Sequence, residues 1–198
     1  MSAAAGTVPG MGVYLYGLDA ADWSSADEGG WRAVASGVNG ALARAGLPPY
    51  EPGDGPGWAF EEKLGRPMDS FTELCGAHLP AGERAALGGW TVMVPVPPAG
   101  EVRLPFATAY DDVAEVVAAA RVLAAAERLA AVLGLPAELP DPHGPLVLTG
   151  WFLDGRAQRL AALSTAPWST DLDAAFHVAL YLRAAQYALR HGRPVAYC

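Results

Sequence analysis

Residues 171–191, DLDAAFHVALYLRAAQYALRH, constrain the fold of this chain more than any other stretch. A helix over this range would be apolar nearly all round, and a helix of that kind is buried on every side. Thr170 is placed to cap its start, and Gly192 is placed to end it. We therefore expect a central helix, with a sheet and other helices packed around it.

Short apolar segments predict the strands. Runs rich in β-branched and aromatic residues, bounded by turn-forming residues, are typical of buried strands. Five segments fit this description: 13–18, 90–96, 101–106, 146–153 and 194–197. Turn-forming residues separate the second segment from the third, so we expect these two to pair as a hairpin.

Apolar residues spaced three and four apart predict further helices. These cover residues 30–45, 70–79, a long segment from Asp111 and Asp112 to Gly134, and about 156–164. Together the elements predict an α+β fold, in which a small mixed sheet of about four to five strands, one hairpin included, packs with about four to five helices.

The chain is 198 residues long, which fits a single domain. Hydrophobic residues make up 52% of the chain and charged residues 17%. This composition excludes intrinsic disorder for most of the chain. We expect residues 1–11 to form a flexible N-terminus and residues 46–59 to form a long loop rich in glycine and proline.

Residues 60–80, FEEKLGRPMDSFTELCGAHLP, concentrate charged and nucleophilic side chains. Pro67 cannot continue a helix from upstream, and Ser70 with Glu73 has the S-x-x-E form of a capping box. The charged residues 61–63, which precede Pro67, are typical of a solvated segment. We therefore interpret most of this stretch as the start of a helix.

Cys75 and His78 lie one helical turn apart and are residue types that bind zinc. Zinc requires three or four ligands, and the sequence offers no second half-site. The same pair would form a thiolate–imidazolium couple if their face opened into a cleft. However, the spacing from Phe71 to Leu79 puts both on the helix face that carries the core contacts. We expect no metal and no other cofactor.

Asp173, His177 and Tyr181 form a second candidate site, because they recur at i, i+4 and i+8 along the last predicted helix. An aspartate at that spacing can orient a histidine and favour its charged form. A polar row on an apolar helix predicts the lining of a cleft. The alternative is an ordinary wet face, with Asp173 placed near the N-terminus for the helix dipole.

Asp19 and Asp22 follow the first predicted strand, where enzymes with α/β folds often place metal-binding or nucleophilic carboxylates. Turn and cap roles explain these two residues equally well. The sequence contains no phosphate-binding loop, zinc-protease motif, nucleophile elbow or dinucleotide fingerprint.

The charge distribution favours a basic protein as partner. The net charge is −8, and residues 1–75 contain ten acidic against four basic residues. A nucleic-acid-binding surface must be basic to neutralise phosphates, so this balance argues against nucleic acid. No uncharged apolar stretch reaches the roughly 18 residues of a membrane span. The alternative is that the acidity serves only solubility.

Aromatic residues gather with acids in the loop 46–59 and just after it. Rigid aromatics beside charges are typical of a protein interface or of a lid over a small ligand. The predicted binding residues are Tyr50, Asp54, Trp58, Phe60, Glu61 and Glu62. The alternative is that the loop folds back and its aromatics fill gaps in the core.

Two hypotheses about function follow. The first is a non-catalytic protein-interaction domain whose acidic surface binds a more basic protein, as inhibitor and immunity proteins do. The second is an enzyme or small-molecule binder with a cleft lined by Asp173, His177 and Tyr181, faced by Cys75 and His78. Reversing the charge of Asp54, Glu61 and Glu62 would slow association under the first, and His177→Ala would abolish activity under the second.

Composition also predicts where such a protein works. Twelve arginines against one lysine, together with abundant alanine, suit a bacterial genome rich in G and C. The two cysteines form no disulfide framework, and the start of the chain has no secretory features. We therefore expect a soluble protein of the bacterial cytoplasm.

Overall fold

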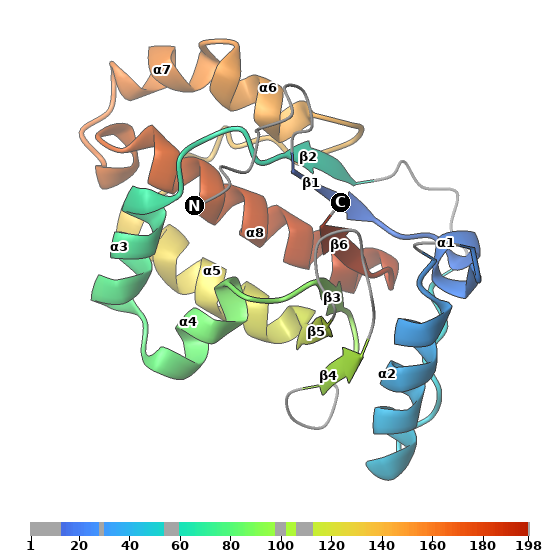
Figure 1. Cartoon of the computed structure of the whole chain (residues 1–198). Helices are drawn as coiled ribbons and strands as arrows, with labels where there is room; N and C mark the ends of the chain where they lie inside the picture. Colours follow the sequence, from blue (N-terminus) through green and yellow to red (C-terminus); the bar gives the residue numbers. More distant parts are fainter. Residues whose placement is uncertain (1–12, 28–29, 54–59, 98–101, 106–112, 198) are drawn as a thin grey trace, which may run out of the picture.

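The computed structural model describes residues 13–27, 30–53, 60–97, 102–105 and 113–197. Their strands are β1 Tyr14–Gly17, β2 Glu61–Lys63, β3 Val92–Val94, β4 Val102–Pro105, β5 Val113–Ala118 and β6 Val195–Tyr197. They form one mixed sheet of six strands in the order β2-β1-β6-β3-β5-β4 (Figure 1). β3 and β5 are parallel, and the other neighbouring pairs are antiparallel.

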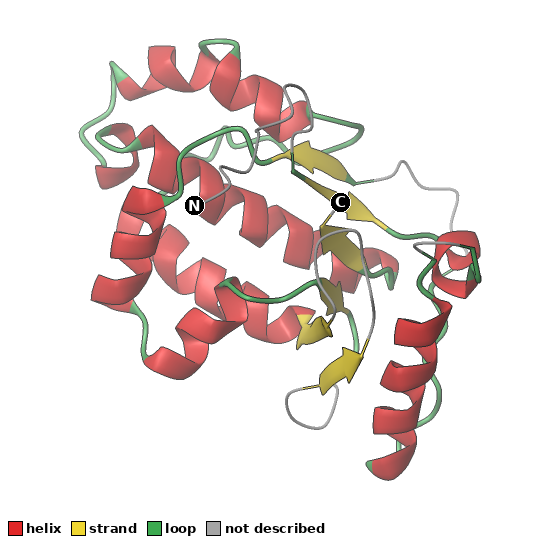
Figure 2. Ribbon diagram, viewed as in Figure 1, coloured by secondary structure: helices red, strands yellow, loops and turns green. Residues whose placement is uncertain are grey.

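Helices lie on both faces of this sheet (Figure 2). The described residues contain the helices α1 Ala20–Ser24, α2 Arg32–Arg44, α3 Asp69–His78, α4 Ala81–Leu87, α5 Ala119–Leu133, α6 Val147–Leu153, α7 Arg156–Ala161 and α8 Leu172–His191, with a 3₁₀ helix η1 Pro167–Ser169. α5 and α8, joined by α3, α4, α6 and α7, pack on one face, whereas α1 and α2 pack on the other.

The alternation of side chains along the strands builds the two cores. Met93 and Val117 point to the face covered by α5 and α8. Their neighbours Val92, Val94 and Val116 point to the face covered by α1 and α2. Because successive residues of a strand face opposite ways, a strand covered on both sides reads as continuously apolar, which is what β3 shows.

The expectation of a central helix near the C-terminus is confirmed. α8 packs against α3, α5, α6, β3 and β6, and thirteen of its twenty residues are buried. Its N-cap is Asp171 rather than Thr170. The Asp171 carboxylate accepts hydrogen bonds from the amides of Asp173 and Ala174, at 3.1 and 2.9 Å.

The α+β class with one mixed sheet is confirmed, but the predicted counts are too low, since the described residues alone form six strands and eight α-helices. The predicted hairpin is wrong: β3 pairs in parallel with β5, and the antiparallel partner of β4 is β5. Residues 113–118 were expected in the long helix. Their sequence, VAEVVA, runs without a break into the alanine-rich α5, so the boundary carries no turn residue.

Two local predictions are also wrong. Residues 146–153, expected as a strand, form helix α6, because a short, wholly apolar run does not distinguish a buried helix from a buried strand. The capping box of Ser70 and Glu73 does not form, since α3 begins at Asp69 without a side-chain cap. The Ser70 hydroxyl instead donates to Asp171 at 3.1 Å, which links α3 to the start of α8.

Candidate functional site

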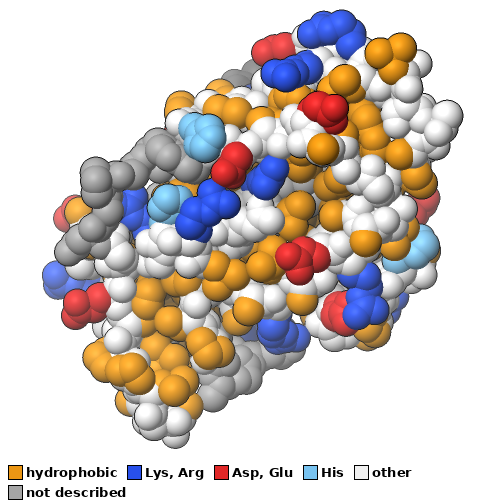
Figure 3. Space-filling view, turned by 180° about the vertical axis from the view of Figure 1, so that it is seen from behind, with side chains coloured by type: hydrophobic (Ala, Val, Ile, Leu, Met, Phe, Trp, Pro, Cys, Tyr) orange, Lys and Arg blue, Asp and Glu red, His pale blue; other side chains and the backbone are white. Residues whose placement is uncertain are grey.

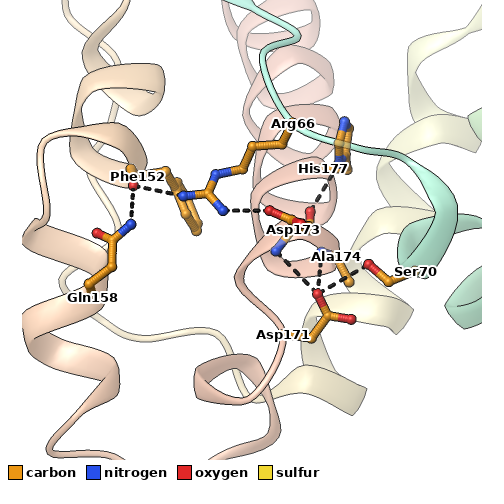
Figure 4. Close-up of polar contacts among 8 residues, drawn as sticks. All are labelled: Arg66, Ser70, Phe152, Gln158, Asp171, Asp173, Ala174 and His177. Atoms are coloured by element: carbon orange, nitrogen blue, oxygen red, sulfur yellow. Dashed lines mark hydrogen bonds and ion pairs between the residues drawn. The ribbon is translucent and has the colours of Figure 1, made fainter.

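Arg66 organises a polar network at the N-terminal end of α8 (Figure 4). Its guanidinium donates to the carboxylate of Asp173 at 2.5 Å and to the carbonyl of Phe152 at 3.0 Å. The Gln158 amide donates to the same carbonyl at 2.9 Å. The Arg66 side chain is only 14% exposed, so it ties the segment after β2 to α6, α7 and α8. Asp173 therefore serves as the ion-pair partner of Arg66.

His177 lies in the core. Its exposed fraction is 0%, and its ring centroid lies 5.5 Å from that of Phe71 and 5.1 Å from that of Phe176. Nδ1 is 2.9 Å from the backbone carbonyl oxygen of Asp173, so in the neutral ring Nδ1–H donates this bond. Nε2 has no hydrogen-bond partner among the described residues. Burial lowers the pKa of His177, which keeps the ring neutral near pH 7.

The packing of α3 on α8 brings Cys75 close to Tyr181, and both are buried. The Tyr181 hydroxyl is 2.8 Å from the hydroxyl of Tyr197, and burial raises the pKa of Tyr181 to about 12. Burial also raises the pKa of the Cys75 thiol to about 11. A nucleophilic cysteine requires the opposite shift, so this arrangement is that of a structural thiol.

His78 does not join this group. It is the last residue of α3 and is exposed, whereas Cys75 faces the core. The prediction that both residues lie on the core face is therefore wrong for His78. The structure brings Cys75, His177 and Tyr181 to neighbouring places in the core, where they form no open cleft, and leaves His78 outside.

Glu62 is a fully buried carboxylate on β2, with an exposed fraction of 0%. Its Oε1 accepts from the amide of Leu148 at 2.8 Å, and its Oε2 accepts from the amide and hydroxyl of Thr149 at 2.7 and 2.6 Å. Burial raises the pKa of Glu62, and these hydrogen bonds oppose the rise. The prediction that residues 61–63 are solvated is wrong for Glu62, which is buried; Glu61 and Lys63 are half-buried on a strand that pairs with β1.

Two of the predicted aromatic binding residues belong to the core. Tyr50 is 7% exposed, and its hydroxyl donates to the carbonyl of Gly192 at 2.8 Å. Burial raises the pKa of Tyr50. Phe60 is fully buried against Tyr187, with the ring centroids 5.4 Å apart. The alternative interpretation, aromatics that fill gaps in the core, describes both residues.

The remaining predicted binding residues give a mixed result. Glu61 is half-buried on β2. Asp54 and Trp58 lie outside the described residues. Of the six predicted positions, the described ones therefore offer a partner little more than part of Glu61, because Tyr50, Phe60 and Glu62 are buried.

Exposed acidic side chains gather instead around α1, at the edge of the molecule (Figure 1). Asp19 and Asp22 cap α1 reciprocally, since each side chain accepts a hydrogen bond from the backbone amide of the other. Asp27 follows this helix. Glu51 is exposed and directly follows Tyr50, whose ring packs on Trp23 of α1 with the ring centroids 5.9 Å apart. We call Asp19, Asp22, Asp27 and Glu51 the α1 acidic face; all four are exposed.

Sequence reasoning missed Arg66 and Thr149, which each form polar contacts between distant segments of the chain. Their partners Asp173 and Glu62 lie 107 and 87 residues away in the chain, so no local pattern relates them. A lone arginine beside a proline, and a threonine in an apolar run, are the weak signals that were present.

Within the described residues, no group of three histidine, cysteine, aspartate or glutamate side chains is arranged to hold a metal ion. None of the described helices combines the length and the apolar character needed to cross a membrane. Comparisons of the chain with protein-family models, with curated proteins and with solved structures gave no match.

Proposed function

We propose that this chain is a non-catalytic protein-interaction domain that binds a more basic protein, in the manner of an inhibitor or immunity protein. The observation that carries the proposal is the α1 acidic face, which presents four exposed carboxylates on adjoining segments. Charges of one sign on a surface steer an oppositely charged partner and raise the association rate.

The surroundings of this face support the proposal. Trp23 and Tyr50 pack edge to face beneath it, so the segments that carry the carboxylates are held by the core. Asn39 fixes the backbone of Tyr50 by donating to its carbonyl at 3.2 Å and accepting from its amide at 2.7 Å. A preorganised surface loses less conformational entropy on binding, which favours affinity.

Burial of the polar row on α8 weighs against the enzymatic alternative. His177 is inaccessible to solvent, Tyr181 is 1% exposed, and Asp173 is engaged by Arg66. A substrate would have to open the core between α3 and α8 to reach His177 and Tyr181. For that reason we favour binding through the surface over chemistry at this row.

The test is charge reversal with a matched control. Asp27→Lys with Glu51→Lys changes the α1 acidic face but leaves the capping pair of Asp19 and Asp22 intact. Glu127→Lys with Glu138→Lys changes the net charge equally at exposed positions that form no described ion pair. The tagged proteins are used to capture partners from the native lysate at low and high salt, and association is then timed with the captured protein.

We expect the first pair to slow association about tenfold at low salt and to flatten its salt dependence, and the second pair to change it much less. Equal effects of the two pairs would mean that only net charge matters, and an unchanged rate with the first pair would refute the acidic face as the interface.

A further inference from the structure

A shallow groove, open to solvent, runs along the outer side of α6, where the described residues border a space of about 410 Å³. Leu146, Val147, Trp151, Asp154, Arg156 and Arg159 are among its lining residues. Volumes of about 300–1,000 Å³ are typical of sites for small molecules. The groove shares no residue with the α1 acidic face or with the polar row on α8.

Helical periodicity explains how the sequence forms this groove. Val147, Gly150, Trp151 and Asp154 recur at i, i+3, i+4 and i+7, so they share one side of α6, and all four line the groove. The residues between them, such as Leu148 and Phe152, are fully buried in the core. Gly150 has no side chain, and the Asp154 carboxylate lies over this position: a Cβ added at Gly150 would be 3.2 Å from Asp154 Oδ2.

The groove is apolar at one end and charged at the other. Leu146 and Val147 line it at the start of α6. Asp154 ends this side of the helix, and Arg156 and Arg159 of α7 stand beside it. From residue 147 to residue 154 the helix rises by about 10 Å, at roughly 1.5 Å per residue. Figure 3 shows positively charged side chains at the upper end of the molecule, where α6 and α7 lie in Figure 1.

The two arginines are available to a ligand. Neither guanidinium forms an ion pair or a hydrogen bond with a described residue, in contrast to Arg66, Arg103, Arg128 and Arg190, which pair with carboxylates. Both side chains are exposed. Two arginines against one aspartate give this end of the groove a positive charge on a protein whose net charge is −8.

The conformation of Leu146 is a second observation that indicates an apolar contact at the end of the groove where α6 begins. Its φ of 58° lies in the left-handed region, and it is the only non-glycine residue with positive φ in the described part of the chain. Its side chain is nevertheless 39% exposed at the mouth of the groove. A large apolar residue held in an unfavourable conformation without being buried contributes little to folding.

We infer that this groove binds a small anionic amphiphile, a molecule with an apolar body about as long as α6 and one carboxylate or comparable anionic group. The apolar body lies along Leu146 and Val147, over the edge of Trp151, which is only 5% exposed. The anionic group accepts charge-assisted hydrogen bonds from Arg156 and Arg159, whose planar guanidinium groups match a carboxylate. This site goes beyond the proposed function and does not depend on it.

The probes are three molecules with the same eight-carbon tail: octanoate, which is anionic, octanol, which is neutral, and octyltrimethylammonium, which is cationic. Each is titrated into the folded full-length protein while amide chemical shifts are followed by NMR. We expect saturable binding of octanoate, with shifts at Gly150 and Gly155, binding of octanol about tenfold weaker or more, and no binding of the cation at this place.

Variants with matched controls identify the charged end. Arg156→Gln with Arg159→Gln should lower the affinity for octanoate to that for octanol. Asp154→Asn should raise it, by up to about fivefold. Arg32→Gln with Arg44→Gln, on α2, removes the same charge on the other face of the sheet and should leave it unchanged.

Three results would overturn the site. Equal affinities for the three probes would show a merely apolar surface. Shifts that map away from α6 and α7 would place the binding elsewhere. An affinity for octanoate that survives the loss of both Arg156 and Arg159 would remove the recognition chemistry on which the assignment rests.

Discussion

Replacing Glu62 by alanine should lower the free energy of unfolding by about 3 kcal/mol, although the residue removed is a buried charge. The truncation leaves the amides of Leu148 and Thr149 without an acceptor, and each unsatisfied buried donor costs about 1–3 kcal/mol. The Thr149 hydroxyl keeps a weak alternative, the carbonyl of Lys63 at 3.4 Å. Relief from burying the carboxylate offsets part of the loss.

Glu62→Gln separates the hydrogen bonds from the charge. The glutamine oxygen can serve Thr149, but its amide nitrogen then faces the Leu148 amide, donor against donor. One lost acceptor and no buried charge predict a loss of about 1–2 kcal/mol. Glu61→Ala is the matched control, since Glu61 is half-buried and should change stability by about 0.5 kcal/mol or less.

Urea unfolding at neutral pH, followed by near-ultraviolet circular dichroism, measures all three variants. Wild type and variants should show similar slopes against urea and displaced midpoints. The reasoning would be refuted if Glu62→Ala lowered the free energy of unfolding by less than about 1 kcal/mol, or by no more than Glu61→Ala. In that case the Glu62 carboxylate would not stabilise the N-terminal end of α6.

Three further predictions concern the core. The pKa of His177 is lower in the folded protein than its value of 6.5 in the unfolded chain, so the unfolded chain binds a proton more readily and the free energy of unfolding should fall as the pH drops from 6.5 through the folded-state pKa. His177→Gln should lose that part of the pH dependence in urea titrations. An unchanged profile would exclude His177 as its source. In a Cys198→Ser variant, Cys75, whose thiol pKa is raised to about 11, should react with Ellman's reagent at least about 100-fold more slowly than the urea-unfolded chain, whereas equal rates would mean that α3 does not protect it. Gly17→Ala should lower the free energy of unfolding by about 1–3 kcal/mol, measured by thermal or urea unfolding, because the new Cβ would lie 2.6 Å from the Tyr187 ring. Tyr187→Leu should lower it less in the Gly17→Ala background than in the wild type. Additive decreases in the free energy of unfolding would argue against this clash.

Local sequence patterns correctly predict the elements whose tertiary packing agrees with their own periodicity. α8 and α2 carry long apolar periodicity with glycine at or near their ends, and β1 and β6 are short runs of β-formers between turn residues. In these segments the periodicity, the stop signals and the burial agree, so the sequence alone leads to the right element.

The segments that were misjudged depend on distant partners. The sequence of α6 alone predicts a strand, but in the structure Glu62 of β2 accepts hydrogen bonds from the first amides of a helix. The sequence of β5 alone predicts the start of helix α5, but in the structure β5 pairs with β3 and β4 as a strand. The Glu62 contacts join residues 86 and 87 positions apart in the chain, which no local window of sequence contains. The pairing of β5 with β3 likewise lies outside the periodicity of the segment itself.

The candidate sites follow the same rule. The row of Asp173, His177 and Tyr181 has the predicted spacing, but the burial of His177 and Tyr181 follows from the packing of α3 on α8, which periodicity does not reveal. The groove on α6 was missed because residues 146–153 were expected to be a strand. In a strand, Val147 and Trp151 would share a face with Leu153, and the i, i+3, i+4 relation that forms the groove would not exist.

The position of β6 in the sheet has a consequence for the newly made chain. β6 is the last of the six strands to be synthesised, yet it lies between β1 and β3 and joins β2-β1 to β3-β5-β4. Until residues 195–197 leave the ribosome, the two partial sheets each present an open edge with unpaired amides and carbonyls. Open edges of this kind invite pairing with other chains. A nascent chain of this protein therefore exposes both edges until β6 has emerged and paired with β1 and β3.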